Sequence, residues 1–363
     1  MPSPNQPPPP FSCQYTPQVP ELLQQLNCSL MLSTYQAGKL IFLSPKDEHS
    51  LVQLPRTFNK VMGVGLHDDK MVLATKDEVL VMRNSPDLAR FYPRKPGTYD
   101  SLFMPRATYY TGLIDIHDID FGVDDRIFAV NTSFSCLIEV NFNYSFTPVW
   151  QPPFISKLAS EDRCHLNGMA LKDGKPKYVT AFNAGDTPQS WREEVTTGGI
   201  LMDVETNNIV AEGLPMPHSP RLYRDALYVL LSAKGALARI NPNTGRYDMV
   251  AQTKGFVRGL AFHGDYAFIG LSKLRQNSST FAKLPFAKQA QQSGIVIVHL
   301  PTGATVGQIV YQTSVDEIYD VQVLPNSIRP NIVNTDKPDY KMGLHIPGTT
   351  FWAPLSNEEK DYF

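Results

Sequence analysis

The chain has 363 residues, of which 42% are apolar and 19% are charged, and this composition excludes a disordered chain of low hydrophobicity. Its 35 acidic and 33 basic residues leave a formal charge of −2, whereas nucleic-acid-binding proteins usually carry a basic excess. We therefore expect no nucleic-acid partner. No run of 18 apolar residues occurs, so we also expect no transmembrane helix and no membrane partner.

Both ends of the chain are expected to lie outside the main domain. Residues 1–20 are rich in proline and predict a disordered tail, which could recruit a protein partner. This segment lacks the charged start and apolar stretch of a secretory signal, and we expect a cytoplasmic protein. Residues 326–363 predict a C-terminal tail that packs on the main domain through Phe351 and Trp352.

The cysteines agree with a reducing compartment. Cys13, Cys28, Cys136 and Cys164 show no CxxC pairing, so a disulfide scaffold or a zinc site built from cysteines is not expected.

Residues 21–325 predict strand after strand in hairpins, with almost no helical periodicity. The first full copy has apolar runs at 61–66 and 71–74, separated by the polar turn His67-Asp-Asp-Lys70, and a third run at 78–82. The same pattern returns from about residues 117, 165, 218 and 258. Repeats of 40 to 60 residues, each a four-stranded meander, are typical of a β-propeller.

The two ends of this region predict one shared blade. Residues 29–33, 39–43 and 50–54 supply only three strands, and residues 318–324 supply a single strand without partners. Together they complete a sixth blade and close the ring, which removes exposed sheet edges. The predicted fold is therefore an all-β, six-bladed β-propeller, with seven blades as the alternative.

One position recurs before the hairpin turn of each copy. Seven or eight residues before the turn stand His117, His165, His218 and Arg258, and the closing blade places Glu317 there. The first copy has Val61 or Met62. These positions begin the innermost strands, which surround the mouth of the central channel.

This ring of residues predicts a metal site. Imidazole nitrogens are ligands for zinc, iron or copper, and a carboxylate can complete the set, so we expect His117, His165, His218 and Glu317 to hold a divalent transition metal. Glu317 is also the candidate general base. Arg258 is the candidate group for an anion or an oxyanion. The alternative is that each histidine only hydrogen-bonds locally at a strand end.

Loops on the same face supply the candidate substrate-binding residues. The two longest links between second and third strands are 182–197 and 272–293, and long loops on one face commonly build a binding site. The candidates from these links, from the shorter links and from the channel itself are Tyr35, Gln36, Asn131, Asn167, Asn183, Trp191, Arg221, Lys234 and Arg275. The Gly63-Val-Gly65 fragment has no following helix and is not expected to bind a dinucleotide.

Several segments resemble an uncharacterised bacterial family of conserved hypothetical proteins from cyanobacteria and proteobacteria. They are 33–40, the His117-Asp-Ile-Asp, His165-Leu-Asn-Gly and His218-Ser-Pro-Arg stretches, and Phe351-Trp352. The resemblance covers nearly the whole chain and implies no known activity. In architecture, the predicted site resembles that of peptidyl-hydroxyglycine lyases, whose zinc is held by three histidines, and that of gluconolactonase-like propellers, whose ligands differ.

Two functions follow as hypotheses. The first is a metal-dependent lyase, hydrolase or oxygen-using enzyme acting on a small or peptide substrate at the channel mouth. The alternative is a non-catalytic propeller scaffold that binds a protein or peptide on its loop face. Fold likeness does not decide between them.

Overall fold

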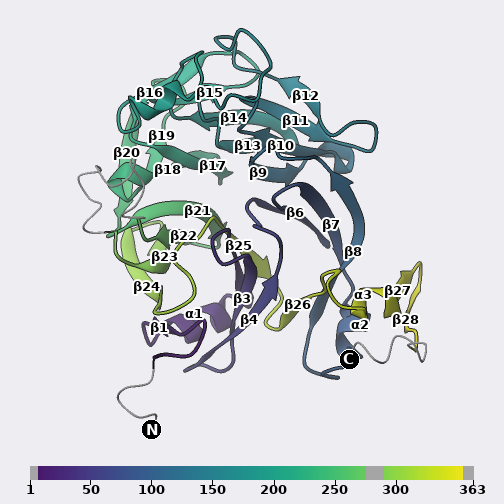
Figure 1. Cartoon of the computed structure of the whole chain (residues 1–363). Helices are drawn as coiled ribbons and strands as arrows, with labels where there is room; N and C mark the ends of the chain where they lie inside the picture. The colour runs from purple at the N-terminus through teal and green to yellow at the C-terminus, as the bar shows by residue number, and fades with distance from the viewer. Residues whose placement is uncertain (1–6, 275–289, 355–363) are drawn as a thin grey trace.

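Six β-sheets surround one central axis in the computed structural model, which describes residues 7–274 and 290–354 (Figure 1). The predicted all-β, six-bladed propeller is confirmed. Within the described residues, no helix is long and apolar enough to cross a membrane.

Each blade is an antiparallel meander whose first strand lies innermost. The first full blade along the chain contains β5 (Val64–His67), β6 (Lys70–Ala74), β7 (Glu78–Asn84) and β8 (Ser101–Tyr110), and the second contains β9 (Ile116–Phe121), β10 (Ile127–Asn131), β11 (Cys136–Val140) and β12 (Thr147–Trp150). The third contains β13 (Gly168–Lys172), β14 (Lys175–Ala181), β15 (Gly199–Asp203) and β16 (Ile209–Leu214), and the fourth contains β17 (Pro217–Tyr223), β18 (Ala226–Leu231), β19 (Ala236–Ile240) and β20 (Tyr247–Gln252). The fifth contains β21 (Phe256–His263), β22 (Tyr266–Ser272), β23 (Ser293–His299) and β24 (Ala304–Tyr311). Short 3-10 turns lie at η1 (Val123–Asp125), η2 (Ser190–Arg192) and η3 (Ser232–Lys234).

The closing blade joins the two ends of the chain as predicted. Strand β25 (Asp320–Pro325) pairs antiparallel with β2 (Cys28–Thr34), and β3 (Lys39–Pro45) and β4 (Leu51–Thr57) complete the sheet. The register runs from Cys28 opposite Pro325 to Ser33 opposite Asp320. This pairing holds the ring shut through backbone hydrogen bonds between segments almost 300 residues apart.

The N-terminal segment is a correction to the sequence prediction. Within the expected disordered tail, β1 (Cys13–Tyr15) pairs with β24 as a fifth strand, and α1 (Val19–Gln25) follows. The outer edge of β24 offers unpaired backbone groups, which a short extended segment can satisfy. Residues 1–6 lie outside the described part of the chain.

The C-terminal segment also adds to a blade. Strand β26 (Pro330–Ile332) pairs parallel with β8, and α3 (Asp339–Met342) leads to the hairpin of β27 (Gly343–Ile346) and β28 (Thr349–Trp352). The hairpin lies beside α2 (Pro86–Arg90) at the rim (Figure 1). Trp352 Nε1 donates to the Leu88 carbonyl at 3.0 Å, whereas Phe351 is 51% exposed.

The apolar core lies between the blades rather than on the axis. Met31 and Phe42 of the closing blade, for example, pack in one cluster with Met71 and Leu73 of the next blade. Similar clusters fill the other interfaces between blades. Middle strands such as β3 and β23 are buried along most of their length, whereas outer strands such as β12 and β20 are partly exposed and mix polar with apolar residues.

Glycines let the innermost strands approach one another closely. A Cβ on Gly65 would lie 2.8 Å from the Asp120 Cα on the neighbouring blade. Gly259 has a φ of +79°, and its Cβ would lie 2.7 Å from the Val321 nitrogen. The Gly63-Val-Gly65 fragment therefore serves blade packing, and the channel is narrow at this depth.

Candidate functional site

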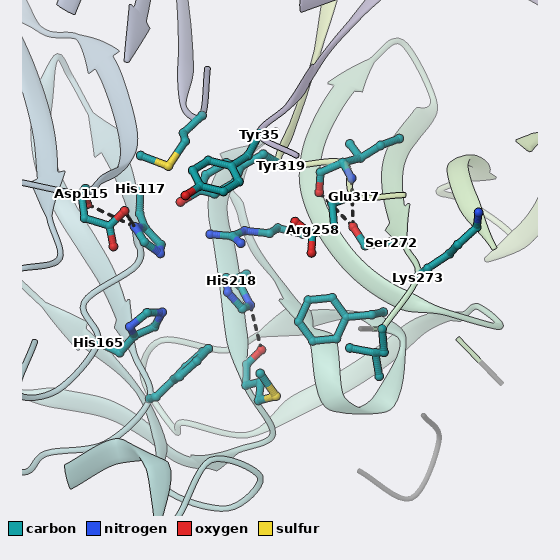
Figure 2. A pocket seen from close by; sticks show the side chains of 16 residues that line it. Tyr35, Asp115, His117, His165, His218, Arg258, Ser272, Lys273, Glu317 and Tyr319 are labelled. Carbon is teal, nitrogen blue, oxygen red and sulfur yellow. Dashed lines mark hydrogen bonds and ion pairs between the residues drawn. The ribbon is translucent and has the colours of Figure 1, made fainter. Parts of the chain in front are cut away.

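The recurring position of the six repeats converges on one axial pocket. Met62, His117, His165, His218, Arg258 and Glu317, one from each blade, all line a pocket of about 320 Å³ at the channel mouth (Figure 2). Three of them lie on the innermost strands β9, β17 and β21, and His165 lies just before β13. The predicted convergence is therefore present in the structure.

β-bulges turn three of these side chains toward the axis. The β9–β10 register places His117 and Asp118 opposite Val130 alone, and the β21–β22 register places Arg258 and Gly259 opposite a single residue. The β17–β18 pairing has the same irregularity directly after His218. Bulges next to active sites often redirect a side chain in this way.

Backbone strain accompanies the same positions. His165 itself has a φ of +51°, and Asp115 and Met216, each two residues before a ring histidine, have φ of +56° and +55°. A residue with a side chain rarely adopts this left-handed region, which costs about 1 kcal/mol or more. The same conformation therefore recurs at the ring position or two residues before it in three blades.

Each ring histidine is held through its Nδ1 atom. His117 Nδ1 donates to the Asp115 carbonyl at 3.1 Å, and His218 Nδ1 donates to the Met216 carbonyl at 3.2 Å. His165 Nδ1 lies 3.0 Å from a carboxylate oxygen of Asp162. Because a carbonyl only accepts, the proton of neutral His117 and His218 is on Nδ1, and their Nε2 atoms carry a lone pair.

Burial keeps two of the histidines uncharged. It places the pKa of His117 and the pKa of His218 well below the usual 6.5, and the nearby cation Arg258 lowers both further. Their rings are also packed: His117 lies edge-on to His165 with centroids 4.9 Å apart, and Phe182 lies edge-on to His218 at 5.1 Å. At neutral pH both rings are therefore unprotonated bases.

Arg258 is the cation at the centre of the pocket. Its guanidinium carbon lies 3.5 Å from the centre of the Tyr319 ring, a cation–π contact, and no ion pair involves it within the described residues. From the sequence, a buried ion pair with Glu317 or Asp316 was the alternative for Arg258. Neither pair is present among the ion pairs of the described residues, and Asp316 pairs instead with Lys273 at 2.7 Å. In Figure 2 the guanidinium projects toward His117 and His218.

A buried charge network closes the channel below this pocket. Arg221 donates to both carboxylate oxygens of Asp118, at 2.8 and 3.2 Å, and lies 3.9 Å from Asp320. Burial raises the pKa of Asp120 to about 7 and raises that of Asp320, although Arg221 opposes both shifts. Arg221 therefore balances a cluster of carboxylates contributed by two other blades.

Comparison with family models matches residues 17–333 to the family described as "Domain of unknown function (DUF4915)". The chain belongs to this family. The match agrees with the expectation that the family is uncharacterised, whereas the specific bacterial family suspected from the sequence stays a prediction. Comparison with curated proteins gave no match.

Solved structures share the propeller fold at low sequence identity. A protein of unknown function from Bacteroides caccae has a TM-score of 0.50 and 11% identity, covering 82% of this chain and 98% of that one. A chain of the nidogen/laminin complex has a TM-score of 0.48 and 9% identity over 82% and 99%. A catalytically inactive virginiamycin B lyase from Staphylococcus aureus, with quinupristin, has a TM-score of 0.42 and 11% identity over 83% and 99%. These likenesses concern the fold alone.

The structure separates the candidate substrate-binding residues. Tyr35 lines the axial pocket, and Trp191, buried against His165 with ring centroids 4.4 Å apart, lines an adjoining hollow. Gln36 and Lys234 are exposed outside the pocket lining, and Lys234 Nζ contacts the Tyr247 hydroxyl. Arg221 lies in the channel floor. Arg275 lies outside the described residues.

The three candidate asparagines pack within their blades. Asn131 accepts the Phe134 backbone N–H, Asn167 accepts the Thr180 hydroxyl, and Asn183 donates to the Ser190 hydroxyl. Asn131 Nδ2 and Asn183 Oδ1 nevertheless have no hydrogen-bond partner within the described residues. The Phe182 end of one long link and the Lys273 end of the other do line the pocket.

Other pocket residues were missed from the sequence. Asp115 and Tyr319, each two residues from a ring position, line the pocket, and the buried Tyr319 hydroxyl has no hydrogen-bond partner within the described residues. Phe182, Met216 and Phe256 form an apolar wall. The available signal for Asp115 was its place two residues before a ring histidine. That spacing alone did not distinguish Asp115 from the other residues near the ring positions.

Proposed function

We propose that this protein is an enzyme that binds a small anionic substrate on Arg258 and moves a proton between that substrate and a neutral imidazole. The observation that carries this proposal is a guanidinium without an ion pair among the described residues, beside two histidines that burial keeps uncharged. The pocket volume of about 320 Å³ suits a small molecule.

The chemistry follows from the atoms present. The Arg258 guanidinium can hold a carboxylate or phosphate by two parallel hydrogen bonds and stabilise negative charge as it develops. Nε2 of His117 or His218 can accept a proton from the bound molecule. Proton abstraction followed by elimination, or activation of water for hydrolysis, are the reactions that this pair supports.

The protonation state of the ring histidines tests the proposal. At pH 6 an ordinary imidazole is mostly protonated, whereas we expect His117 and His218 to stay neutral with the proton on Nδ1, because burial and Arg258 lower the pKa of each. Nitrogen-15 NMR of histidine-labelled protein measures this, with His117→Gln and His218→Gln assigning the signals. Two imidazolium rings at pH 6 would contradict the proposal, since a charged ring cannot accept a proton.

A divalent transition metal is the second candidate, and the Nδ1 contacts favour it. Histidines that bind metal commonly donate their other ring N–H to a carbonyl or carboxylate, as His117, His165 and His218 do. With Glu317 these residues would hold the ion, which would polarise a substrate oxygen. We place this candidate second because Arg258 adds a permanent positive charge beside the rings, and because the described residues contain no group of three or more His, Cys, Asp or Glu side chains that could hold an ion together.

Elemental analysis separates the two candidates. We expect less than about 0.1 equivalent of zinc, iron or copper in protein purified without chelator and dialysed against the metal. The reason is that the positive charge of the neighbouring guanidinium repels a metal cation bound to the imidazoles. The matched sample is the His165→Ala, His218→Ala double variant. Near-stoichiometric metal that disappears in the double variant would place the metal-dependent enzyme first.

A further inference from the structure

Among the described lining residues of the axial pocket, the fixed charges cancel. Asp115 and Glu317 supply two negative charges among its lining residues, and Arg258 and Lys273 supply two positive charges. A ligand that carries only negative charge would therefore face a carboxylate as well as the guanidinium.

Asp115 is the carboxylate best placed to meet a ligand. It has a left-handed backbone, and its carbonyl holds His117, so the side chain is set beside that ring at the pocket wall. The side chain is 49% exposed, and His117 Nδ1 lies 3.6 Å from one of its carboxylate oxygens. No ion pair joins this carboxylate to a lysine or arginine of the described residues, so a cationic group of a ligand can pair with it.

A second hollow continues from the pocket past the same residues. Asp115, His117, His165 and Arg258 line both the axial pocket and an adjoining hollow of about 820 Å³, which also includes Glu161 and Asp162. Arg192 also lines this hollow. The site thus has a cationic group at the centre and a carboxylate at the edge shared with the second hollow (Figure 2).

We infer that the ligand of this site is zwitterionic, with an anionic group on Arg258, a protonated amine on Asp115 and an apolar body against Phe182, Met216 and Phe256. This inference rests on the proposed function and names its substrate class: free amino acids, their close derivatives and short peptides with apolar side chains. A ligand with only an anionic group would place a negative charge near the Asp115 carboxylate. An ammonium group instead offers this carboxylate three hydrogen-bond donors and a positive charge.

Matched probes test this inference by calorimetry. Phenylalanine, leucine and methionine are each compared with their N-acetyl derivatives, which keep the carboxylate and lose the ammonium group, and 4-bromobenzoate serves as an anion without an amine. We expect at least one free amino acid to bind about tenfold or more tightly than its N-acetyl derivative, the usual scale of a charge-assisted hydrogen bond. In Asp115→Asn this ratio is expected to fall to about one, while Arg258→Gln weakens both members of the pair.

The outcomes separate the inference from the function beneath it. Suppose that 4-bromobenzoate or an N-acetyl derivative binds and no free amino acid binds more tightly than its own N-acetyl derivative. That result excludes a zwitterionic ligand but agrees with an anion-binding site on Arg258. If the ratio is tenfold in the parent and unchanged in Asp115→Asn, the amine does not lie on Asp115 and the inference is wrong. If no probe of either kind binds to the folded protein, the proposed function itself is contradicted. Melting temperatures of both variants verify that each is folded.

Discussion

Arg221→Met is expected to lower the free energy of unfolding by about 3 kcal/mol. Methionine roughly preserves the length of the side chain but removes the charge that faces Asp118 and Asp320. Removing one partner of a buried ion pair leaves the other charge uncompensated, which typically costs about 3–5 kcal/mol. We use the lower end because the Arg221 side chain is 21% exposed. Urea unfolding at pH 7 measures the change.

Arg224→Met is the matched control for this variant. Arg224 lies three residues further along the same blade and pairs with Asp265 at the surface, where both side chains are more than half exposed. Exposed pairs contribute little to stability, so the control is expected to unfold near the parent midpoint. Adding Asp118→Asn to Arg221→Met is expected to recover part of the loss, because it removes one unbalanced charge. Equal effects of the two arginine substitutions would contradict the role given to the network.

Arg258→Gln is expected to weaken binding of 4-bromobenzoate at least tenfold. Glutamine keeps a hydrogen-bond donor but removes the charge and the forked geometry that holds a carboxylate by two bonds. A hydrogen bond to a charged group contributes about 1.5–3 kcal/mol, which corresponds to about 10- to 150-fold in the dissociation constant. Calorimetric titration measures the change, and the melting temperature shows whether the variant remains folded.

Lys273→Gln is the matched control in the same pocket. It also removes one positive charge from the lining, but Lys273 is already paired with Asp316 at 2.7 Å. We expect its affinity for 4-bromobenzoate to stay within about threefold of the parent, because a paired and partly exposed lysine offers little additional attraction. If the lysine variant loses more affinity than the arginine variant, the anion does not lie on Arg258.

The sequence predicted the fold where local patterns repeat. Hairpins with the same spacing gave six blades, and the three N-terminal strands without an inner partner, together with one unpaired C-terminal strand, predicted the closing blade. Strands β1 and β26 were not predicted, because each has three residues and forms only on an edge supplied by a distant part of the chain. Their stability comes from tertiary context rather than from local propensity.

The candidate site could be predicted only in part for a related reason. Distance from the hairpin turn placed His117, His165, His218, Arg258 and Glu317 in one pocket, since equivalent positions of a repeat meet at the axis. The bulges and left-handed residues that orient these side chains leave no simple periodic signal. The pairing of Arg221 with Asp118 joins residues 103 positions apart, and nothing in either local segment indicates it.

The hypothesis of a non-catalytic scaffold stays a prediction, and ligand binding in the axial pocket tests it. A scaffold that binds through its loop face needs no charged ligand on the axis and no neutral histidines beside it. The axial pocket is therefore the place where the two hypotheses differ most.

The most direct test is a crystal structure of the protein soaked with 4-bromobenzoate, in which the bromine marks the ligand by its anomalous scattering. The account predicts one strong bromine peak in the axial pocket against the wall of Phe182, Met216 and Phe256, with the carboxylate in hydrogen-bonding contact with both terminal nitrogens of Arg258. Bromine peaks confined to the outer surface, with Arg258 still stacked on Tyr319 and free of ligand at saturating concentration, would contradict it.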